Sequence, residues 1–206
     1  MTLRILLGVF LLFCSFQDSK VWVFAYGSLM HEGSASRTLS REALESRRPA
    51  VAYGVKRIYN RQMPEELIIP RFGPLAKPSD RAALNVKQTG QDSDRVNGVL
   101  VKVSHEELRR LAEREIGYDR IQVPVTFWGE EATSSPFMAY SFSAPDTKPL
   151  TSREITPIPG YLELVEEGAA SYGPTFLRQY LQETFLADEQ TPLFTRENIQ
   201  DPRPRQ

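Results

Sequence analysis

The chain has 206 residues, of which 41% are hydrophobic, enough for one sizeable core and unlike the composition of a disordered protein. Its 25 lysines and arginines nearly balance 26 aspartates and glutamates, so no basic excess indicates a nucleic-acid partner, and a small neutral or zwitterionic ligand fits the charge balance. Two histidines and one cysteine argue against both a zinc cluster and a disulfide framework.

The first 19 residues are typical of a secretory signal or a membrane anchor. One arginine precedes an apolar run that begins at Ile5 and extends to Phe16, shorter than the about 20 residues that cross a bilayer as a helix. Bulky Phe13 stands where a cleavage site needs a small residue, so an upstream start or an additional apolar strand is the alternative. We expect membrane association only through residues 4–16. The protein would be exported or anchored if residues 1–19 are a signal, and cytoplasmic otherwise.

The next part of the chain contains two predicted strands and two polar connections. Apolar, β-prone residues predict strands at 21–26 and 50–60, the second with a bulge or close packing at Gly54. The polar stretch 31–50 predicts at most a short helix in its latter half. Residues 61–81 are rich in proline, glycine and charge, and predict a long loop that forms a lid or a wall of a site.

The middle of the chain contains the clearest helix. Residues 82–88 and 95–103 predict two strands, and the polar link between them predicts a hairpin turn. Residues 104–115 predict a helix, because Ser104 and Glu107 have the spacing of a capping box.

Two strands and two helices complete the predicted elements. Strands are predicted at 118–128, where Pro124 favours an edge or a bulge, and at 136–144. Helices are predicted at 160–173 and 174–186.

This order of elements predicts an α+β fold with a curved, mainly antiparallel sheet or small barrel and helices packed outside it. We expect one domain over residues 20–190, preceded by the signal-like segment 1–19 and followed by a polar tail at 191–206.

The first predicted strand ends on Tyr26-Gly27-Ser28, which contributes little to a core. Ser28 lacks the G-x-S-x-G frame of a hydrolase nucleophile, since Tyr26 and Met30 stand where the glycines belong. Two interpretations remain: an ordinary turn, or a backbone nest in which Gly27 lets an anion such as an α-carboxylate approach the amides.

The end of the predicted helix 104–115 carries a second candidate site. Glu113 and Glu115 lie near a helix C-terminus, where negative charge is unfavourable by about 0.3–1 kcal/mol. One interpretation is a solvated face on which Arg114 and Arg120 are ion-pair partners. The other is that one carboxylate turns inward as a general base whose pKa burial raises.

Four segments together resemble the γ-glutamylcyclotransferase superfamily. They are "FAYGSLM" (24–30), "AALNV" before "VNGVLVKV", "REIGYDRIQV" (114–123) and "PGYLELVEEGAASYG" (159–173), in the order of the family and over roughly residues 21–180. The resemblance implies a small mixed, mainly antiparallel β-barrel with flanking helices. It also implies release of 5-oxoproline from a small-molecule γ-glutamyl amine or peptide, with no metal and no organic cofactor.

The resemblance also implies the site residues. Glu115 matches the catalytic glutamate, with Glu113 as the alternative, and Tyr161 matches a tyrosine across the substrate pocket. The loop that holds the γ-glutamyl group matches Val23, Phe24, Ala25, Tyr26, Gly27, Ser28 and Leu29. The leaving group stays open among glutathione, γ-glutamyl amino acids and γ-glutamyl-ε-lysine. The same fold could also belong to a non-catalytic γ-glutamyl or amino-acid binding homologue, or to a γ-glutamyl transferase-like or deprotecting enzyme.

Overall fold

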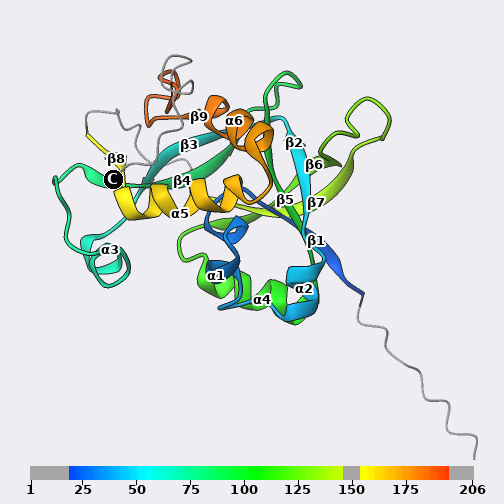
Figure 1. Ribbon diagram of the computed structural model, residues 1–206, viewed down its shortest axis with the longest axis horizontal. Coiled ribbons are helices and arrows are strands. Elements are labelled where there is room, and N and C mark those ends of the chain that lie inside the picture. The colour runs from blue at the N-terminus through cyan, green and yellow to red at the C-terminus, as the bar shows by residue number, and fades with distance from the viewer. Residues whose placement is uncertain (1–18, 146–153, 195–206) are drawn as a thin grey trace, which may run out of the picture.

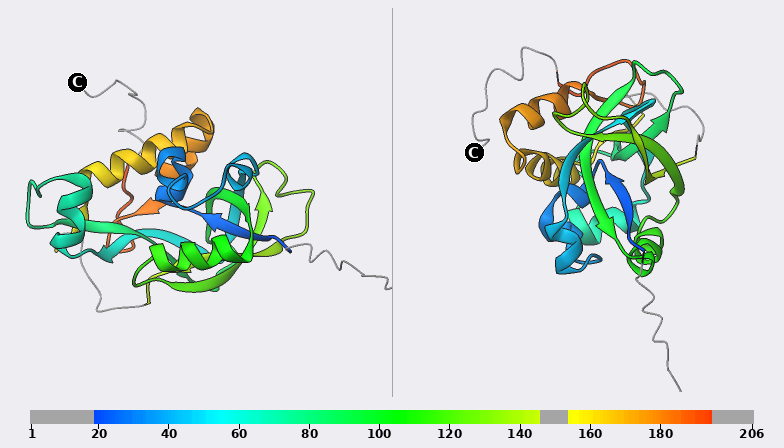
Figure 2. Two further views of the ribbon diagram at one scale, coloured as in Figure 1. Left: turned by 90° about the horizontal axis from the view of Figure 1, so that it is seen from below. Right: turned by 90° about the vertical axis from the view of Figure 1, so that its right-hand side faces the viewer.

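A computed structural model describes residues 19–145 and 154–194, which form a closed barrel and a second sheet with helices around them (Figures 1 and 2). The barrel contains, in spatial order, β1 (Val21–Ala25), β5 (Arg95–Val103), β2 (Arg48–Tyr53), β6 (Asp119–Phe127) and β7 (Phe137–Ser143). The second sheet contains β8 (Thr156–Pro157), β4 (Asp80–Gln88), β3 (Val55–Gln62) and β9 (Thr184–Phe185). Most neighbouring strands are antiparallel, whereas the pairs β1–β7, β3–β9 and β4–β8 are parallel. The predicted α+β barrel with flanking helices is confirmed.

The predicted hairpin between residues 82–88 and 95–103 is wrong. β4 pairs with β3 and β8, whereas β5 pairs with β1 and β2 in the barrel. β2 and β3 are consecutive in the chain, and β5 and β4 run antiparallel to them, respectively. Tyr53 pairs with Arg95 and Val55 pairs with Gln88, so residues 89–94 form a wide bulge opposite the single residue Gly54. Gly54 donates to the carbonyl of Asp94 at 2.7 Å and accepts from the amide of Thr89 at 2.8 Å. Turn-forming residues suit a bulge as well as a hairpin, so composition does not distinguish the two.

Gly54 also divides the predicted strand 50–60 into two. Its φ of +69° lies in the left-handed region that glycine adopts without steric cost. The chain leaves the barrel at this residue and enters the second sheet, so the bulge predicted at Gly54 is the point where the two sheets join.

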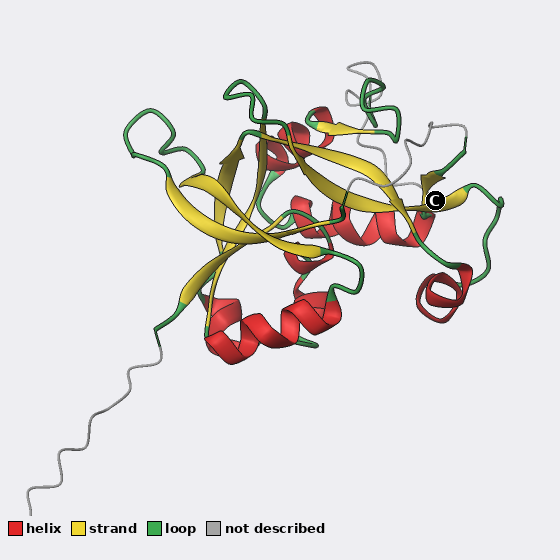
Figure 3. Ribbon diagram, turned by 180° about the vertical axis from the view of Figure 1, so that it is seen from behind, coloured by secondary structure: helices red, strands yellow, loops and turns green. Residues whose placement is uncertain are grey.

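The predicted loop 61–81 contains more regular structure than its composition indicates. β3 extends to Gln62, helix α3 spans Glu65–Phe72, and β4 begins at Asp80. Ile68 of this helix is buried, although Pro70 lies inside the helix. Tertiary burial of the apolar face therefore outweighs the local preference against a helix. Figure 3 shows α3 beyond the second sheet, away from the barrel.

Five further helices surround the sheets within the described ranges: α1 (Glu32–Ala35), α2 (Arg41–Glu45), α4 (His105–Arg114), α5 (Pro159–Ala170) and α6 (Pro174–Gln182). A short 3₁₀ turn, η1, spans Ser28–Met30. The described residues include no helix that is long and apolar enough to cross a membrane. The signal-like segment, apart from residue 19, and most of the polar tail lie outside the described residues.

Helix α6 is shorter than the predicted helix 174–186, and a buried arginine binds one group in its last turn and one group just beyond it. Arg57 of β3 donates to the carbonyl of Tyr180 at 2.8 Å and to the hydroxyl of Thr184 at 2.8 Å. Thr184 thereby joins β9 at the edge of β3 instead of continuing the helix.

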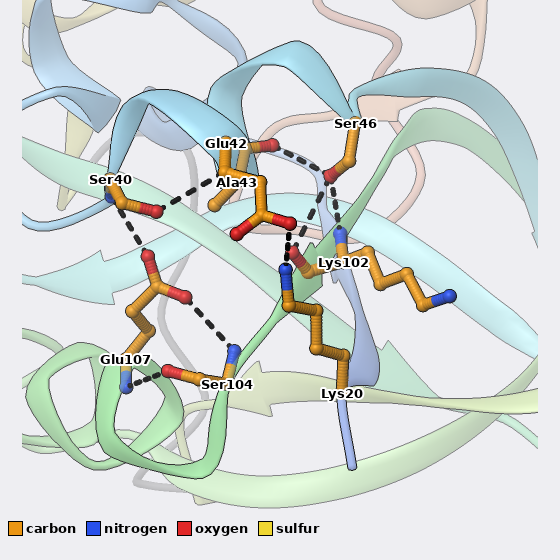
Figure 4. A network of polar contacts seen from close by, with 8 residues as sticks. All are labelled: Lys20, Ser40, Glu42, Ala43, Ser46, Lys102, Ser104 and Glu107. Carbon is orange, nitrogen blue, oxygen red and sulfur yellow. Dashed lines mark hydrogen bonds and ion pairs between the residues drawn. The ribbon is translucent and has the colours of Figure 1, made fainter. Parts of the chain in front are cut away.

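Two helices are capped through one buried carboxylate, that of Glu107 (Figure 4). Its two oxygens accept from the amides of Ser40 at 2.8 Å and Ser104 at 2.9 Å, the N-cap residues of α2 and α4. The capping box predicted from Ser104 and Glu107 is confirmed. The same side chain fixes α2 against α4, a tertiary role beyond that of a capping box.

Helix α5 packs directly on the backbone that follows β1. A Cβ atom on Gly168 would lie 2.7 Å from the amide nitrogen of His31 and 3.0 Å from the carbonyl carbon of Met30. Both contacts are with backbone, which cannot rotate away. The absence of a side chain at residue 168 therefore sets the distance between α5 and η1.

We expect Gly168→Ala to destabilise the protein by about 1–3 kcal/mol through overpacking, although alanine favours helix over glycine by about 1 kcal/mol. Gly160→Ala is the matched control in the same helix, because its Cβ would meet only the Phe72 side chain, at 3.3 Å. Chemical denaturation of both variants measures the difference. Equal stability of the two variants would contradict the close packing of α5.

Candidate active site

A cavity of about 360 Å³ opens between α3, α5 and the C-terminal end of α4. A recess of about 40 Å³ adjoins it on the side of β1. Ser28, Glu115, Tyr118 and Tyr161 line both spaces. The structure therefore brings the two candidate sites of the sequence, the loop after β1 and the end of α4, to one place.

The loop after β1 forms one wall of the recess. Its contribution runs from Phe24 through Leu29, and Leu84 and Phe142 add apolar contacts. Val23, which was also expected to bind substrate, lies outside both linings. It is buried in the barrel, where it pairs with Val101 and Tyr140.

Two tyrosines hold this loop in place from the core. The hydroxyl of Tyr26 donates to the carbonyl of Phe142 at 2.6 Å, and the hydroxyl of Tyr180 donates to the carbonyl of Tyr26 at 3.0 Å. The predicted turn is thus anchored on both sides by buried hydrogen bonds.

Three successive backbone amides of the loop are available to a ligand. Among residues 19–145 and 154–194, no group accepts a hydrogen bond from the amides of Gly27, Ser28 and Leu29. The carbonyl groups of Gly27 and Ser28, in contrast, accept hydrogen bonds from the amides of Met30 and His31. Backbone amides without a partner in one turn are the feature that an anion-binding nest requires.

Residue 27 is a glycine because another residue approaches it closely. Its φ of −137° does not itself require glycine. A Cβ at this position would lie 2.9 Å from the hydroxyl oxygen of Tyr161. Tyr161 is in turn held by edge-on contacts with Tyr59 and Phe72, at centroid distances of 6.3 and 5.9 Å. The contact between the loop and Tyr161 of α5 therefore leaves no room for a side chain at residue 27.

Glu115 follows the last residue of α4 and faces inward. Its amide donates to the carbonyl of Leu111, and its side chain is 21% exposed. Burial raises the pKa of the Glu115 carboxyl, although the charges of Arg114 and Arg71 act in the opposite direction. A carboxyl with a raised pKa suits proton transfer near neutral pH.

Glu113, the alternative candidate, lies elsewhere. Its side chain is 62% exposed and forms an ion pair with Arg109 on the surface of α4. It lines neither the cavity nor the recess. The structure places only one of the two glutamates in the candidate site.

Arg114 is not the solvated ion-pair partner that one interpretation of the sequence expected. Its side chain is 22% exposed, and its Nε lies 3.7 Å from a carboxylate oxygen of Glu115. The guanidinium donates to the carbonyl and the hydroxyl of Ser34, both at 2.7 Å, and to the hydroxyls of Thr38 at 3.2 Å and Ser28 at 3.3 Å. Arg114 thus joins the loop after β1, helix α1 and Glu115.

Tyr118 completes the inner lining. Its hydroxyl donates to the carbonyl of Leu84 at 2.6 Å, and burial, together with the charge of Glu115, raises its pKa. Burial also raises the pKa of Tyr161. Both phenols therefore stay protonated at neutral pH, so each keeps an O–H group.

The cavity residues that sequence reasoning missed include two arginines, Arg37 after α1 and Arg71 in α3. The sequence predicts a loop over 61–81, which gives Arg71 no defined position. The expectation that this segment forms a wall of a site was the one available signal, and α3 does form a wall through Leu67, Ile68 and Phe72.

The described ranges contain no group of three histidine, cysteine, aspartate or glutamate side chains placed as metal ligands. The chemistry that the described residues themselves offer is proton transfer by Glu115 and anion binding by the loop amides.

Comparison with known proteins gives a family match. The profile of the family described as "Gamma-glutamyl cyclotransferase, AIG2-like" matches residues 23–157. No curated protein matches the chain in sequence.

Solved structures share the fold at low sequence identity. YkqA from Bacillus subtilis has a TM-score of 0.55 at 20% identity, over 78% of this chain and 52% of that chain, so this chain spans about half of YkqA. A gamma-glutamyl cyclotransferase has a TM-score of 0.53 at 16% identity, over 79% of this chain and 86% of that chain. A yeast gamma-glutamyl cyclotransferase specific to glutathione has a TM-score of 0.50 at 17% identity, over 79% of this chain and 96% of that chain.

The contact between Gly27 and Tyr161 gives a test of the recess. We expect Gly27→Ala to weaken binding of γ-glutamyl ligands at least tenfold, because the added methyl group meets the Tyr161 hydroxyl. Tyr161→Phe removes that oxygen, so the double variant should recover part of the affinity relative to Gly27→Ala alone. Calorimetric titration measures all three variants. Unchanged affinity in Gly27→Ala would indicate that the loop is an ordinary turn that does not bind the ligand.

Proposed function

The chain belongs to the γ-glutamyl cyclotransferase, AIG2-like family, and on this premise we propose that it converts γ-glutamyl amines or peptides to 5-oxoproline and a free amine. The observation that carries the proposal is that one recess is lined by Glu115 and by residues 27–29, whose amides donate to no described group. The wider cavity beside this recess leaves room for the amine that departs.

The substrate of such a reaction contains its own nucleophile. The α-amine of a γ-glutamyl group reaches the γ-carbonyl carbon by closing a five-membered ring, so Ser28 needs no activation. At neutral pH the amine is mostly protonated and cannot attack. A base beside it is therefore the first requirement of the site.

Glu115 meets this requirement in the proposed mechanism. Its carboxylate takes a proton from the ammonium group, and the free amine then attacks the γ-carbonyl carbon. The new carbon–nitrogen bond closes the ring, and Glu115 returns the proton to the departing nitrogen. The ring nitrogen then gives its second proton to the Glu115 carboxylate, which releases it to the solvent. The old carbon–nitrogen bond breaks, and the carbonyl of 5-oxoproline re-forms. General acid–base catalysis of this kind is worth about 10²–10⁴-fold.

The loop after β1 has two tasks in this scheme. Its amides bind the substrate α-carboxylate, and they stabilise the negative charge that develops on the γ-carbonyl oxygen. The small recess keeps the glutamyl chain folded, so that the amine stays against the carbonyl. Such positioning supplies much of the remaining rate enhancement.

The alternative of a binding protein without activity requires the same pocket but no buried acid. The partly buried position of Glu115 supports the enzyme instead. Glutathione is one γ-glutamyl peptide among the candidate substrates.

We expect Glu115→Gln to reduce 5-oxoproline release at least 10²-fold, because the amide has nearly the same shape and cannot accept the proton. Glu113→Gln is the matched control, since it makes the same change two residues away on the exposed surface. The assay follows 5-oxoproline from glutathione, γ-glutamyl amino acids and γ-glutamyl-ε-lysine. Near wild-type turnover in Glu115→Gln would show that another group transfers the proton.

The pH dependence gives a separate test of the same residue. Burial raises the pKa of Glu115 above its ordinary value of 4.5, and the reaction uses the ionised form. We therefore expect kcat/KM to fall as the pH decreases through a value above 4.5. It should fall again at high pH, because a substrate that has already lost its ammonium proton leaves Glu115 with no proton to return to the departing nitrogen. An acid limb at or below 4.5 would contradict the buried carboxylate as the base.

A further inference from the structure

The cavity beside Glu115 carries an excess of positive charge. Its lining contains three arginines, Arg37, Arg71 and Arg114, against a single acidic residue, Glu115. Arg114 is committed to Glu115 and to its acceptors on Ser28 and Ser34. The guanidinium groups of Arg37 and Arg71 are free to act on a ligand.

Arg37 and Arg71 approach the cavity from different elements. Arg37 lies between α1 and α2, and Arg71 lies in the last turn of α3. Within the described ranges, neither guanidinium has a hydrogen-bond or ion-pair partner. Both are exposed, which places their charged groups at the open side of the cavity.

The three charges act on one another across this space. Desolvation, together with the positive charges of Arg37 and Arg71, lowers the pKa of Arg114, and Arg71 also acts to lower the pKa of Glu115. The mutual repulsion of like charges is relieved when an anion binds among them.

The remaining lining is largely apolar. The apolar residues of the walls include Met63, Leu67, Ile68, Phe72, Ile158 and Leu164. A ligand that fits this cavity therefore combines an apolar body with an anionic group that reaches the arginines.

We propose that Arg37 and Arg71 bind a carboxylate on the leaving group, so that the enzyme prefers γ-glutamyl amino acids and peptides over γ-glutamyl amines without a carboxylate. This inference rests on the proposed function, because it assigns the recess to the γ-glutamyl half and the cavity to the other half. Guanidinium groups suit a carboxylate because their paired donors match its two oxygens.

Two substrates of nearly identical shape test the charge alone. γ-Glutamyl-leucine carries the carboxylate, and γ-glutamyl-leucinamide carries a neutral amide at the same place. We expect wild-type kcat/KM for 5-oxoproline release to be at least tenfold higher with the carboxylate substrate, as is typical for a charge-assisted hydrogen bond. The ratio should decrease at high salt, because the two arginines are exposed.

The double variant Arg37→Met/Arg71→Met should bring this ratio close to one. Arg110→Met is the matched control, because Arg110 is an exposed arginine of α4 outside the cavity, and it should keep the wild-type ratio. Loss of Arg71 also raises the pKa of Glu115, but that effect cancels in the ratio, since both substrates use the same carboxylate.

Binding measured without turnover separates this inference from the proposed function. In the Glu115→Gln background, calorimetric titration should show tighter binding of γ-glutamyl-leucine than of its amide, and the two arginine substitutions should remove the difference. A ratio near one in the wild type, or an unchanged ratio in the double variant, overturns the arginine assignment alone. Absence of 5-oxoproline release from both substrates, with the binding preference intact, overturns the proposed function alone.

Discussion

The Arg114 guanidinium is the interaction on which the candidate site depends. It is mostly withdrawn from water, and it holds Ser28, Ser34 and Thr38 by hydrogen bonds while it lies 3.7 Å from Glu115. Burying a charge is costly unless partners replace its hydration, and this set of acceptors does so. One side chain therefore sets the position of the loop after β1 relative to the acid at the end of α4.

Burial of the Glu115 carboxyl affects both the stability of the fold and the proton transfer proposed for this residue. Removal from water raises the pKa of Glu115, which weakens folding at neutral pH, where the carboxylate is ionised. It also brings the pKa of the carboxyl closer to the range in which a base can take and return a proton. The positive charges of Arg114 and Arg71 favour the ionised form and therefore partly oppose this increase in the pKa of Glu115. The balance between desolvation and two guanidinium groups therefore sets the chemistry of the site.

The two sheets explain why residues so far apart in sequence line one cavity. The chain passes between barrel and second sheet at Gly54 and again at residues 89–94, so β3 and β4 extend away from the barrel (Figure 1). Helix α5 packs on η1 through Gly168. The cavity lies between α3, α5 and the end of α4, at the end of β3 and β4 far from Gly54, where Met63 and Ala83 line it. Neither sheet alone would bring Glu115, Tyr161 and the loop after β1 together.

Local sequence by itself determined most of the elements, because hydrophobic alternation, capping residues and glycines act over a few neighbours. The helix that begins after Ser104 and the strand that begins at Val21 are both of this kind. The partner of each strand and the surroundings of each charge depend on residues that are distant in sequence. For that reason only the tertiary structure decided that β4 leaves β5 for β3, that Arg114 is buried while Glu113 is exposed, and that α3 forms a wall with Arg71. Folding energy at these positions comes from burial and long-range pairing, which local pattern does not encode.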